Sequence, residues 1–312
     1  MNTSFYHACV KDRSAMRKIN IQLDDGTYSG DVEVAGKLAE KHFEELLSGL
    51  ILIGEGAYPR DSRNESFLES ILVLVEERDN ADLEAISDEK EIRKAVLSLN
   101  PESAPGPDGF PGSFNVAAWE FISLQMIDVV QDFFHRGHLP RAVCASKLVL
   151  IPKIKDPTSI NQFRTIRLSN FSCNIIYSII NRRLSRVLPQ IISEDHHGFI
   201  QGRSIHRDIA IAKEMVDDIN RRDIDSNIMT KVYLDNDYDM MEWDFIFKVM
   251  ERFCFRYWPC DLLFRCFASP WLVVSLMGRI FGFFKIIRGL RLGDLVSPSL
   301  FILTQEALLR NF

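Results

Sequence analysis

Apolar side chains recur along much of the chain at the spacing of an α-helix, and polar or turn-forming residues interrupt the pattern. Residues 32–47 place apolar side chains on one stripe, and Asp31 is positioned to cap the first turn. Residues 87–99 repeat the arrangement with Ser87 as the capping residue. The same spacing predicts four further helices, one that stops at Gly137, one over residues 171–188 closed by Pro189, and two over residues 204–220 and 243–255. Arg182, Arg183 and Arg186 are expected on the outer side of the helix over residues 171–188.

Other segments alternate between apolar and polar residues, which is typical of β-strands. Residues 146–153 and 228–235 show this period of two, and residues 271–284 predict two strands around a turn near Gly278. The segment 228–235 leads into a cluster of aspartates and then into the helical pattern. A strand that ends in carboxylates before a helix can hold a divalent cation against a nucleotide triphosphate.

The composition indicates a globular protein: 46% of the 312 residues are hydrophobic and 26% are charged, which fits one or two domains. The uncharged run 266–278 is shorter than the roughly 20 residues of a membrane-spanning helix, so no membrane partner is expected. The charged residues 11–13 are followed by no apolar segment, so we expect no signal peptide. The six cysteines show neither a zinc spacing nor a disulfide framework, so we expect reduced, mostly buried thiols in an intracellular protein and no disulfide-linked partner.

Charge is distributed unevenly along the chain. The net charge is −6, which argues against a simple nucleic-acid-binding protein. Residues 141–222, however, contain 14 basic and 7 acidic residues, a local charge of +7. This region is either a surface that follows a phosphate backbone or a set of solvated helix faces with mixed charge.

The segment 228–243 resembles the first aspartate motif of reverse transcriptases from the non-LTR (LINE-type) retrotransposons common in plants. That motif reads roughly Lys-Val/Leu-Asp-Leu/Met-x-Lys-Ala-Tyr/Phe-Asp-x-x-x-Trp. Laid on the chain without a gap, the metal-binding aspartate of the motif falls on Tyr233. The residues that match the motif are Lys231, Val232, Tyr238, Asp239 and Trp243.

Four other strings carry the same resemblance in the same order. Residues 104–110, Ala-Pro-Gly-Pro-Asp-Gly-Phe, resemble the start of the fingers in that family, and residues 150–153 and 162–168 resemble its Leu-Ile-Pro-Lys and Phe-Arg-Pro-Ile-Ser-Leu strings. Residues 288–298 resemble Arg-Gly-Leu-Arg-Gln-Gly-Asp-Pro-Leu-Ser-Pro. The resemblance implies that a group of residues binds the incoming nucleotide: Lys153, Arg164, Tyr238, Arg291 and Gly293. The positions that depart from the family strings include Thr165, Arg167, Leu292 and Leu295.

The resemblance also implies an architecture and a set of partners. We expect an α+β fold, a partial right-hand polymerase with a helical lead-in over 1–95, fingers over 96–222 and part of the palm over 223–312. The family uses Mg²⁺, an RNA template and a DNA primer, and the expected location is the nucleus or cytoplasm. We also expect the chain to be a truncated fragment of marginal stability, because an incomplete sheet leaves an unpaired edge.

The catalytic constellation of the family is not intact in this sequence. A neutral tyrosine at position 233 is a poor ligand for Mg²⁺, which prefers anionic oxygens. A gapped alignment would make Asp235 the metal ligand, but in the ungapped one Asp235 lies about 6–7 Å further along the strand. The Phe/Tyr-x-Asp-Asp string that supplies the other carboxylates is absent from the 312 residues. We therefore predict an inactive polymerase domain that does not bind Mg²⁺ productively; the alternatives are a nucleic-acid-binding remnant and a fragment without function.

Overall fold

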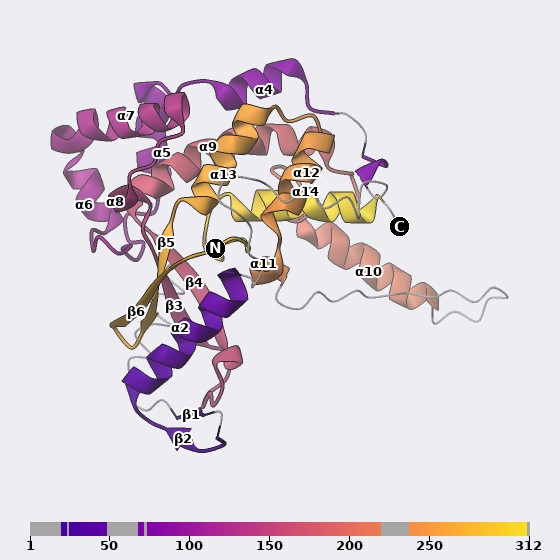
Figure 1. Cartoon of the computed structure of the whole chain (residues 1–312). Coiled ribbons are helices and arrows are strands. Elements are labelled where there is room, and N and C mark those ends of the chain that lie inside the picture. Colours follow the sequence, from indigo (N-terminus) through magenta and orange to yellow (C-terminus); the bar gives the residue numbers. More distant parts are fainter. Residues whose placement is uncertain (1–19, 24, 49–67, 72–73, 220–236, 311–312) are drawn as a thin grey trace.

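The computed structural model describes residues 20–23, 25–48, 68–71, 74–219 and 237–310 (Figure 1). The predicted strand 228–235, with Tyr233 and Asp235, lies outside the described residues. In chain order the elements are β1 (Ile21–Gln22), β2 (Tyr28–Ser29), α2 (Val32–Ser48), α4 (Glu77–Glu84), α5 (Glu89–Ser98), α6 (Gly112–Ala117), α7 (Trp119–Arg136), α8 (Arg141–Cys144), β3 (Ser146–Pro152), the 3₁₀-helix η2 (Ile160–Gln162), β4 (Phe163–Ser169), α9 (Phe171–Ile191), α10 (Ile205–Ile219), α11 (Asp237–Met240), α12 (Trp243–Arg252), α13 (Tyr257–Ala268), β5 (Trp271–Leu276), β6 (Arg279–Lys285) and α14 (Ser297–Leu309).

A four-stranded sheet in the order β4-β3-β5-β6 joins segments that are far apart in the chain. The pairs β3–β4 and β5–β6 are antiparallel hairpins. The alternating pattern predicted both strands of β5–β6, whereas it did not predict β4. The two hairpins meet through the parallel pair β3–β5, in which Ser146 lies beside Leu272. Side chains of β3 and β5 alternate between the buried and the half-buried face, which is the periodicity that identified them as strands.

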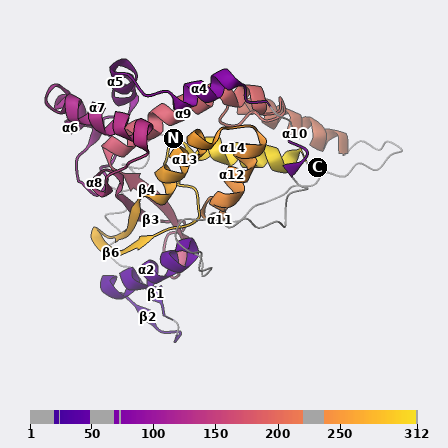
Figure 2. The same cartoon turned by 45° about the horizontal axis from the view of Figure 1, so that its top comes forward.

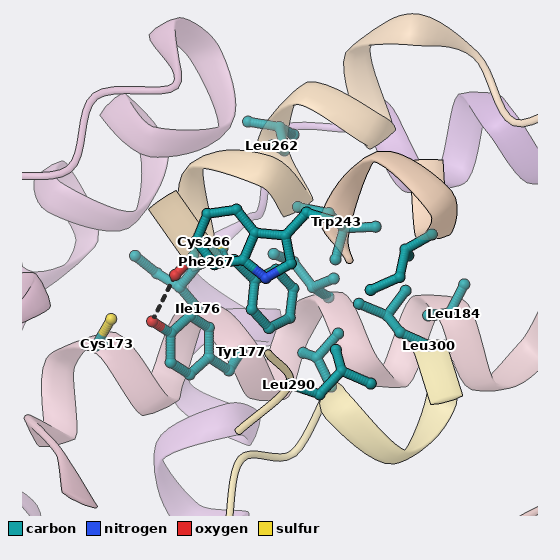
Figure 3. Close-up of a cluster of buried hydrophobic side chains, with 14 of the residues drawn as sticks. Cys173, Ile176, Tyr177, Leu184, Trp243, Leu262, Cys266, Phe267, Leu290 and Leu300 are labelled. Atoms are coloured by element: carbon teal, nitrogen blue, oxygen red, sulfur yellow. Dashed lines mark hydrogen bonds between the residues drawn. The ribbon is translucent and has the colours of Figure 1, made fainter. Parts of the chain in front are cut away.

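Most of the helices pack above this sheet, whereas α2 lies against its β5–β6 hairpin (Figures 1 and 2). The long helix α9 is central to the packing and contacts α4, α5, α7 and α14. Its buried side chains Ile176, Tyr177 and Leu184 meet side chains of α12, α13 and α14 in one apolar cluster (Figure 3). The mixture of helices and sheet confirms the expected α+β class.

Several helix ends agree with the sequence prediction and two do not. The carboxylate of Asp31 accepts a hydrogen bond from Glu33 N at 2.9 Å, and Gly137 ends α7 in the left-handed conformation. At α5 the capping residue is Asp88, whose carboxylate accepts from Glu91 N at 2.7 Å, and the predicted cap Ser87 is buried instead. Pro189 does not close α9, which continues to Ile191, because a proline near the C-terminus removes only its own N–H from the helical pattern.

Helix α10 differs from the other long helices because none of its side chains is buried. Figure 1 shows it projecting from the body of the molecule. Its exposed apolar residues include Ile205, Ile209 and Met215. Among the described residues, no helix has both the length and the apolar character needed to cross a membrane.

Candidate functional site

The β3–β4 hairpin presents two cations near its tip. Lys153 N donates to Gln162 O at 2.7 Å, which closes the loop between the strands, and Ile151 pairs with Arg164 across the hairpin. Lys153 and Arg164 therefore lie diagonally across the hairpin end, and both side chains are exposed. Two solvated cations on a short hairpin can neutralise the charge of a phosphate group.

The loop 288–298 docks beside this hairpin through backbone hydrogen bonds. Arg167 N, on β4, donates to Leu292 O at 3.0 Å, and Leu290 N donates to Tyr238 O at 2.6 Å. Gly289 and Gly293 both have φ values in the left-handed region, +89° and +99°. A Cβ atom on Gly289 would lie 3.0 Å from the backbone oxygen of Asp239, so this close approach requires glycine.

Arg291, in the same loop, is buried rather than presented to solvent, with an exposed fraction of 1%. Its guanidinium donates hydrogen bonds to the Tyr177 hydroxyl and to the backbone oxygens of Cys266 and Phe267. It also lies 5.2 Å from the ring centroids of Tyr177 and Phe267. Burial alone would lower the pKa of Arg291, but Tyr177 and Asp294 more than offset that effect and the pKa is raised. The structure therefore places this predicted nucleotide-binding residue inside the core of the domain.

The two other residues of the predicted nucleotide site lie on either side of the docked loop. Tyr238 is half-buried and stacks on Phe301, with ring centroids 4.8 Å apart. Burial raises the pKa of its hydroxyl to about 12, so the phenol is neutral at physiological pH. Gly293 is exposed, and its φ of +99° is a conformation that side-chain-bearing residues rarely adopt, so substituting it would strain the loop beside β4.

Arg167, on the same hairpin as the two exposed cations, carries its charge inside the protein. It is buried, and its Nε and Nη1 atoms have no hydrogen-bond partner among the described residues. Burial, together with the charge of Arg291, lowers the pKa of Arg167 to about 9. The carboxylates of Asp239 and Asp294 act in the opposite direction. Serine stands at this position in the family string, so the sequence carries a buried cation where the string has a small polar side chain.

Burial also shifts the pKa values of two carboxylates near the hairpin, Asp239 and Asp294. It raises the pKa of Asp239, and the charges of Arg167 and Lys153 partly counter that rise. It raises the pKa of Asp294 as well, although Arg291 Nη1 lies 3.7 Å from its Oδ2. Removal from water therefore raises the proton affinity of both carboxylates, and the cationic side chains nearby limit that rise.

These carboxylates do not fit a divalent cation. A hard cation such as Mg²⁺ binds several oxygen ligands, and the described residues contain no group of three or more His, Cys, Asp or Glu side chains that could hold a metal ion. The neighbourhood of Asp239 and Asp294 already contains the buried cations Arg167 and Arg291, which repel a metal ion. Tyr233 and the fallback ligand Asp235 are not among the described residues.

The basic segment 141–222 is not one continuous face. Arg183 was expected on the outer side of its helix, but it is 4% exposed and its Nε and Nη2 atoms bond to the two carboxylate oxygens of Glu91, at 3.0 and 2.5 Å. That expectation was wrong, because Arg183 continues the buried stripe of Ile176 and Ile180 at helical spacing. Arg203 is also engaged within the chain, where it donates to backbone oxygens near the end of α9, including His196 O at 2.7 Å.

The alternating pattern of β4 is a local sequence signal for the burial of Arg167. Phe163, Thr165 and Ser169 are buried along β4, and Arg167 occupies the same alternating positions. A strand with a period of two directs all of them to one face. Helical spacing from Ile176 and Ile180 likewise indicated the burial of Arg183, but no local signal indicated its partner Glu91, which is 92 residues away.

Two comparisons with known proteins show what this chain is similar to. The chain is 23% identical over 308 residues to the "Transposon TX1 uncharacterized 149 kDa protein" of Xenopus laevis, and the match covers 98% of this chain and 23% of the length of that protein. The family described as "Reverse transcriptase (RNA-dependent DNA polymerase)" matches residues 151–312, just over half of the chain, which include the hairpin tip and the docked loop. The chain therefore belongs to the reverse transcriptase (RNA-dependent DNA polymerase) family.

Proposed function

We propose that this chain forms the fingers and part of the palm of a LINE-type (non-LTR) retrotransposon reverse transcriptase of the kind common in plants. In this proposal the chain holds an RNA template and a DNA primer, in the nucleus or cytoplasm, without extending the primer. Residues 96–222 act as fingers, residues 223–312 as the partial palm, and residues 1–95 as the segment that precedes them.

The observation that supports binding is the exposed pair of Lys153 and Arg164 at the tip of a hairpin whose β4 strand is hydrogen-bonded to the loop 288–298. Phosphoryl-transfer proteins depend largely on positioning and on neutralising phosphate charge, and this arrangement supplies both. The buried Arg291 supports the shape of the loop from inside, and the exposed Gly293 lets a ligand approach the backbone.

The observation that supports inactivity is Tyr233 at the position of the metal-binding aspartate. A neutral phenol does not replace a carboxylate at Mg²⁺, and Asp235 is displaced by much more than the tolerance of a preorganised site, about 0.5 Å. The described carboxylates Asp239 and Asp294 interact with the buried cation Arg167. We therefore assign no step of nucleotide addition to this chain.

Two assays test the proposal together. Fluorescence anisotropy should show that the chain binds an RNA–DNA primer–template, with affinity that falls steeply as salt is raised. The double variant Lys153→Gln/Arg164→Gln should bind on the order of tenfold more weakly and show a slope of log K against log salt that is shallower by about 1–2. In the second assay, with Mg²⁺ and nucleotides, the primer should remain unextended.

Each assay can overturn its own part of the proposal. Extension of the primer by the purified chain would show that Tyr233 does not abolish activity. Absence of binding at low salt would support the alternative of a fragment without function. Equal binding by the wild type and the double variant would remove the hairpin tip from the interface.

A further inference from the structure

An open groove lies between α5 and α9, away from the hairpin tip. Four basic side chains and two small or apolar ones line it: Lys90, Arg93, Lys94, Leu97, Ser98 and Arg182. Figure 1 shows α5 near the end of the hairpin where β3 begins, opposite the loop that carries Lys153. The groove is therefore separate from the site described above.

The groove has a defined wall. Arg182, from α9, reaches across to α5 and donates from Nη2 to Lys94 O at 3.1 Å. Its Nη1 atom is buried and has no hydrogen-bond partner among the described residues. Lys90, Arg93 and Lys94 occupy the exposed face of α5 opposite the buried Ile92 and Val96.

Two of the acidic residues at the start of α5 are engaged elsewhere, and the third, Glu89, is exposed in the first turn beside Lys90 but is not among the residues that line the groove. Asp88 caps the helix through Glu91 N, and Glu91 is bound by the buried guanidinium of Arg183. No carboxylate is among the residues that line the groove. The surface is strongly positive within a chain whose net charge is −6.

The size of the groove suits a phosphodiester backbone. Lys90 and Leu97 are seven residues apart, which is about 10 Å along the axis of a helix. A nucleic-acid strand in a duplex advances about 3.4 Å per phosphate, so this length corresponds to about three phosphates. The exposed Leu97 at the end of the row offers an apolar contact for a sugar or base.

We propose that the groove between α5 and α9 is a second nucleic-acid contact, which binds the phosphodiester backbone of an RNA or DNA strand beyond the strand held at the hairpin tip. The groove extends the nucleic-acid-binding surface of the domain from the hairpin tip to helices α5 and α9. This inference goes beyond the proposed function and assigns a role to charges that the hairpin site does not use.

The test compares two triple variants of the full chain by anisotropy with a labelled primer–template that carries a single-stranded RNA overhang. The groove variant is Lys90→Gln/Arg93→Gln/Lys94→Gln. The control variant, Lys37→Gln/Lys41→Gln/Arg252→Gln, removes the same charge from exposed positions on α2 and α12. All substitutions are on helix surfaces, and the urea midpoints should match that of the wild type.

The groove variant should reduce the salt slope by about 2–3 and weaken binding on the order of 100-fold at about 0.1 M salt, whereas the control variant should bind like the wild type. Equal losses in both variants, or no loss in the groove variant, would overturn the inference. It would also fail if polyglutamate of matched charge bound as tightly as RNA and depended equally on the groove, because the partner would then be an acidic polypeptide. Wild-type binding that is lost in the hairpin variant and kept in the groove variant would leave the proposed function intact and remove only the groove.

Discussion

At the scale of single residues, the buried Arg291 organises the loop beside the hairpin. The Tyr177 hydroxyl accepts a hydrogen bond from Arg291 and donates to Cys266 O at 3.2 Å, so one atom connects α9, α13 and the loop. Figure 3 shows this hydroxyl and Cys266 at the edge of the apolar cluster. The interaction is fully desolvated, which makes the loss of either partner costly.

Tyr177→Phe should therefore lower the free energy of unfolding by about 1.5–3 kcal/mol, since it removes a partner of a charged group without changing the ring. Urea denaturation measures the effect. Tyr257→Phe is the matched control, because the side chain of Tyr257 is 73% exposed and its variant should stay within about 0.5 kcal/mol of the wild type. Equal stability of the two variants would show that the Tyr177 hydroxyl does not anchor Arg291.

Asp294 gives a pH dependence whose sign follows from its burial. Its pKa in the folded state is raised above the ordinary carboxyl value, so between the two values the folded chain binds more protons than the unfolded chain. Acidification through this window therefore stabilises the fold through Asp294. The wild type should gain stability relative to Asp294→Asn as the pH falls from about 7 to about 4, measured by urea denaturation at each pH. A relative loss on acidification would mean that the ion pair with Arg291 outweighs the burial of the carboxylate.

The sequence predicted whether some side chains are exposed or buried better than it did for others. The exposure of Lys153 and Arg164 agrees with their place at the end of a strand-like segment. The burial of Arg291 could not be predicted, because its partners Tyr177 and Cys266 lie 114 and 25 residues away in the chain. Local patterns indicate which face a side chain occupies within its element, but they do not show which other element covers that face.

At the scale of elements, Arg183 connects α9 to α5 and to the segment before α5. Besides Glu91, it bonds to Ala85 O at 2.5 Å and to the Ser87 hydroxyl at 3.0 Å, and it lies 4.7 Å from the ring centroid of Phe134. Ser87 therefore anchors the start of α5 although it does not cap the helix. These contacts join three helices through one guanidinium.

Arg183→Ala should destabilise the chain by about 3–5 kcal/mol, because it leaves Glu91 and two backbone oxygens without their buried partner. Thermal or urea unfolding measures the loss. Arg186→Ala, one turn along the same helix, is the control: its side chain is exposed, and the expected change is within about 0.5 kcal/mol. If the two variants lost the same stability, the cluster around Arg183 would not link the helices.

Helix α13 is a long element that the hydrophobic pattern did not predict. Its apolar residues occur on several sides, and seven of its twelve residues are buried, so no clear polar face marks a helical period. The amphipathic helices α2, α7 and α9 were found because each keeps a polar side. Hydrophobic periodicity therefore identifies helices that have one side exposed to solvent, but not helices that are buried on most sides.

At the scale of the whole molecule, α10 leaves an apolar surface exposed to solvent. Ile205 and Ile209 are four residues apart on one stripe and are 57% and 47% exposed. Exposed apolar patches of this kind promote self-association. The helix is tied to the body through His197, whose Nδ1 lies 2.5 Å from the carboxylate of Asp208.

The double variant Ile205→Glu/Ile209→Glu should reduce association without lowering the unfolding midpoint, because neither side chain is buried and acidic residues suit the first turn of a helix. Light scattering as a function of protein concentration measures association, and urea denaturation measures stability. A drop in stability comparable to that of a core substitution, about 2 kcal/mol or more, would show that the stripe packs against the fold.

The expected fold class was confirmed, but the sheet order could not be predicted from the strand patterns. Each hairpin follows from neighbouring strands with a short or moderate connection. The parallel pair β3–β5 joins Ser146 to Leu272, and no local pattern specifies a partner at that distance. The resemblance assigned the segment of β3 to the fingers and the segment of β5 to the partial palm, so their shared sheet was not predicted.

The strand β5 is translated long after its partner β3, and this delay affects folding during synthesis. A ribosome adds roughly 5–20 residues per second, so β5 emerges about 6–25 s after β3. During that interval the β3–β4 hairpin has an open edge on the side that β5 later covers. Folding of this domain during synthesis therefore depends on keeping one strand edge free of other chains until its neighbour has been translated.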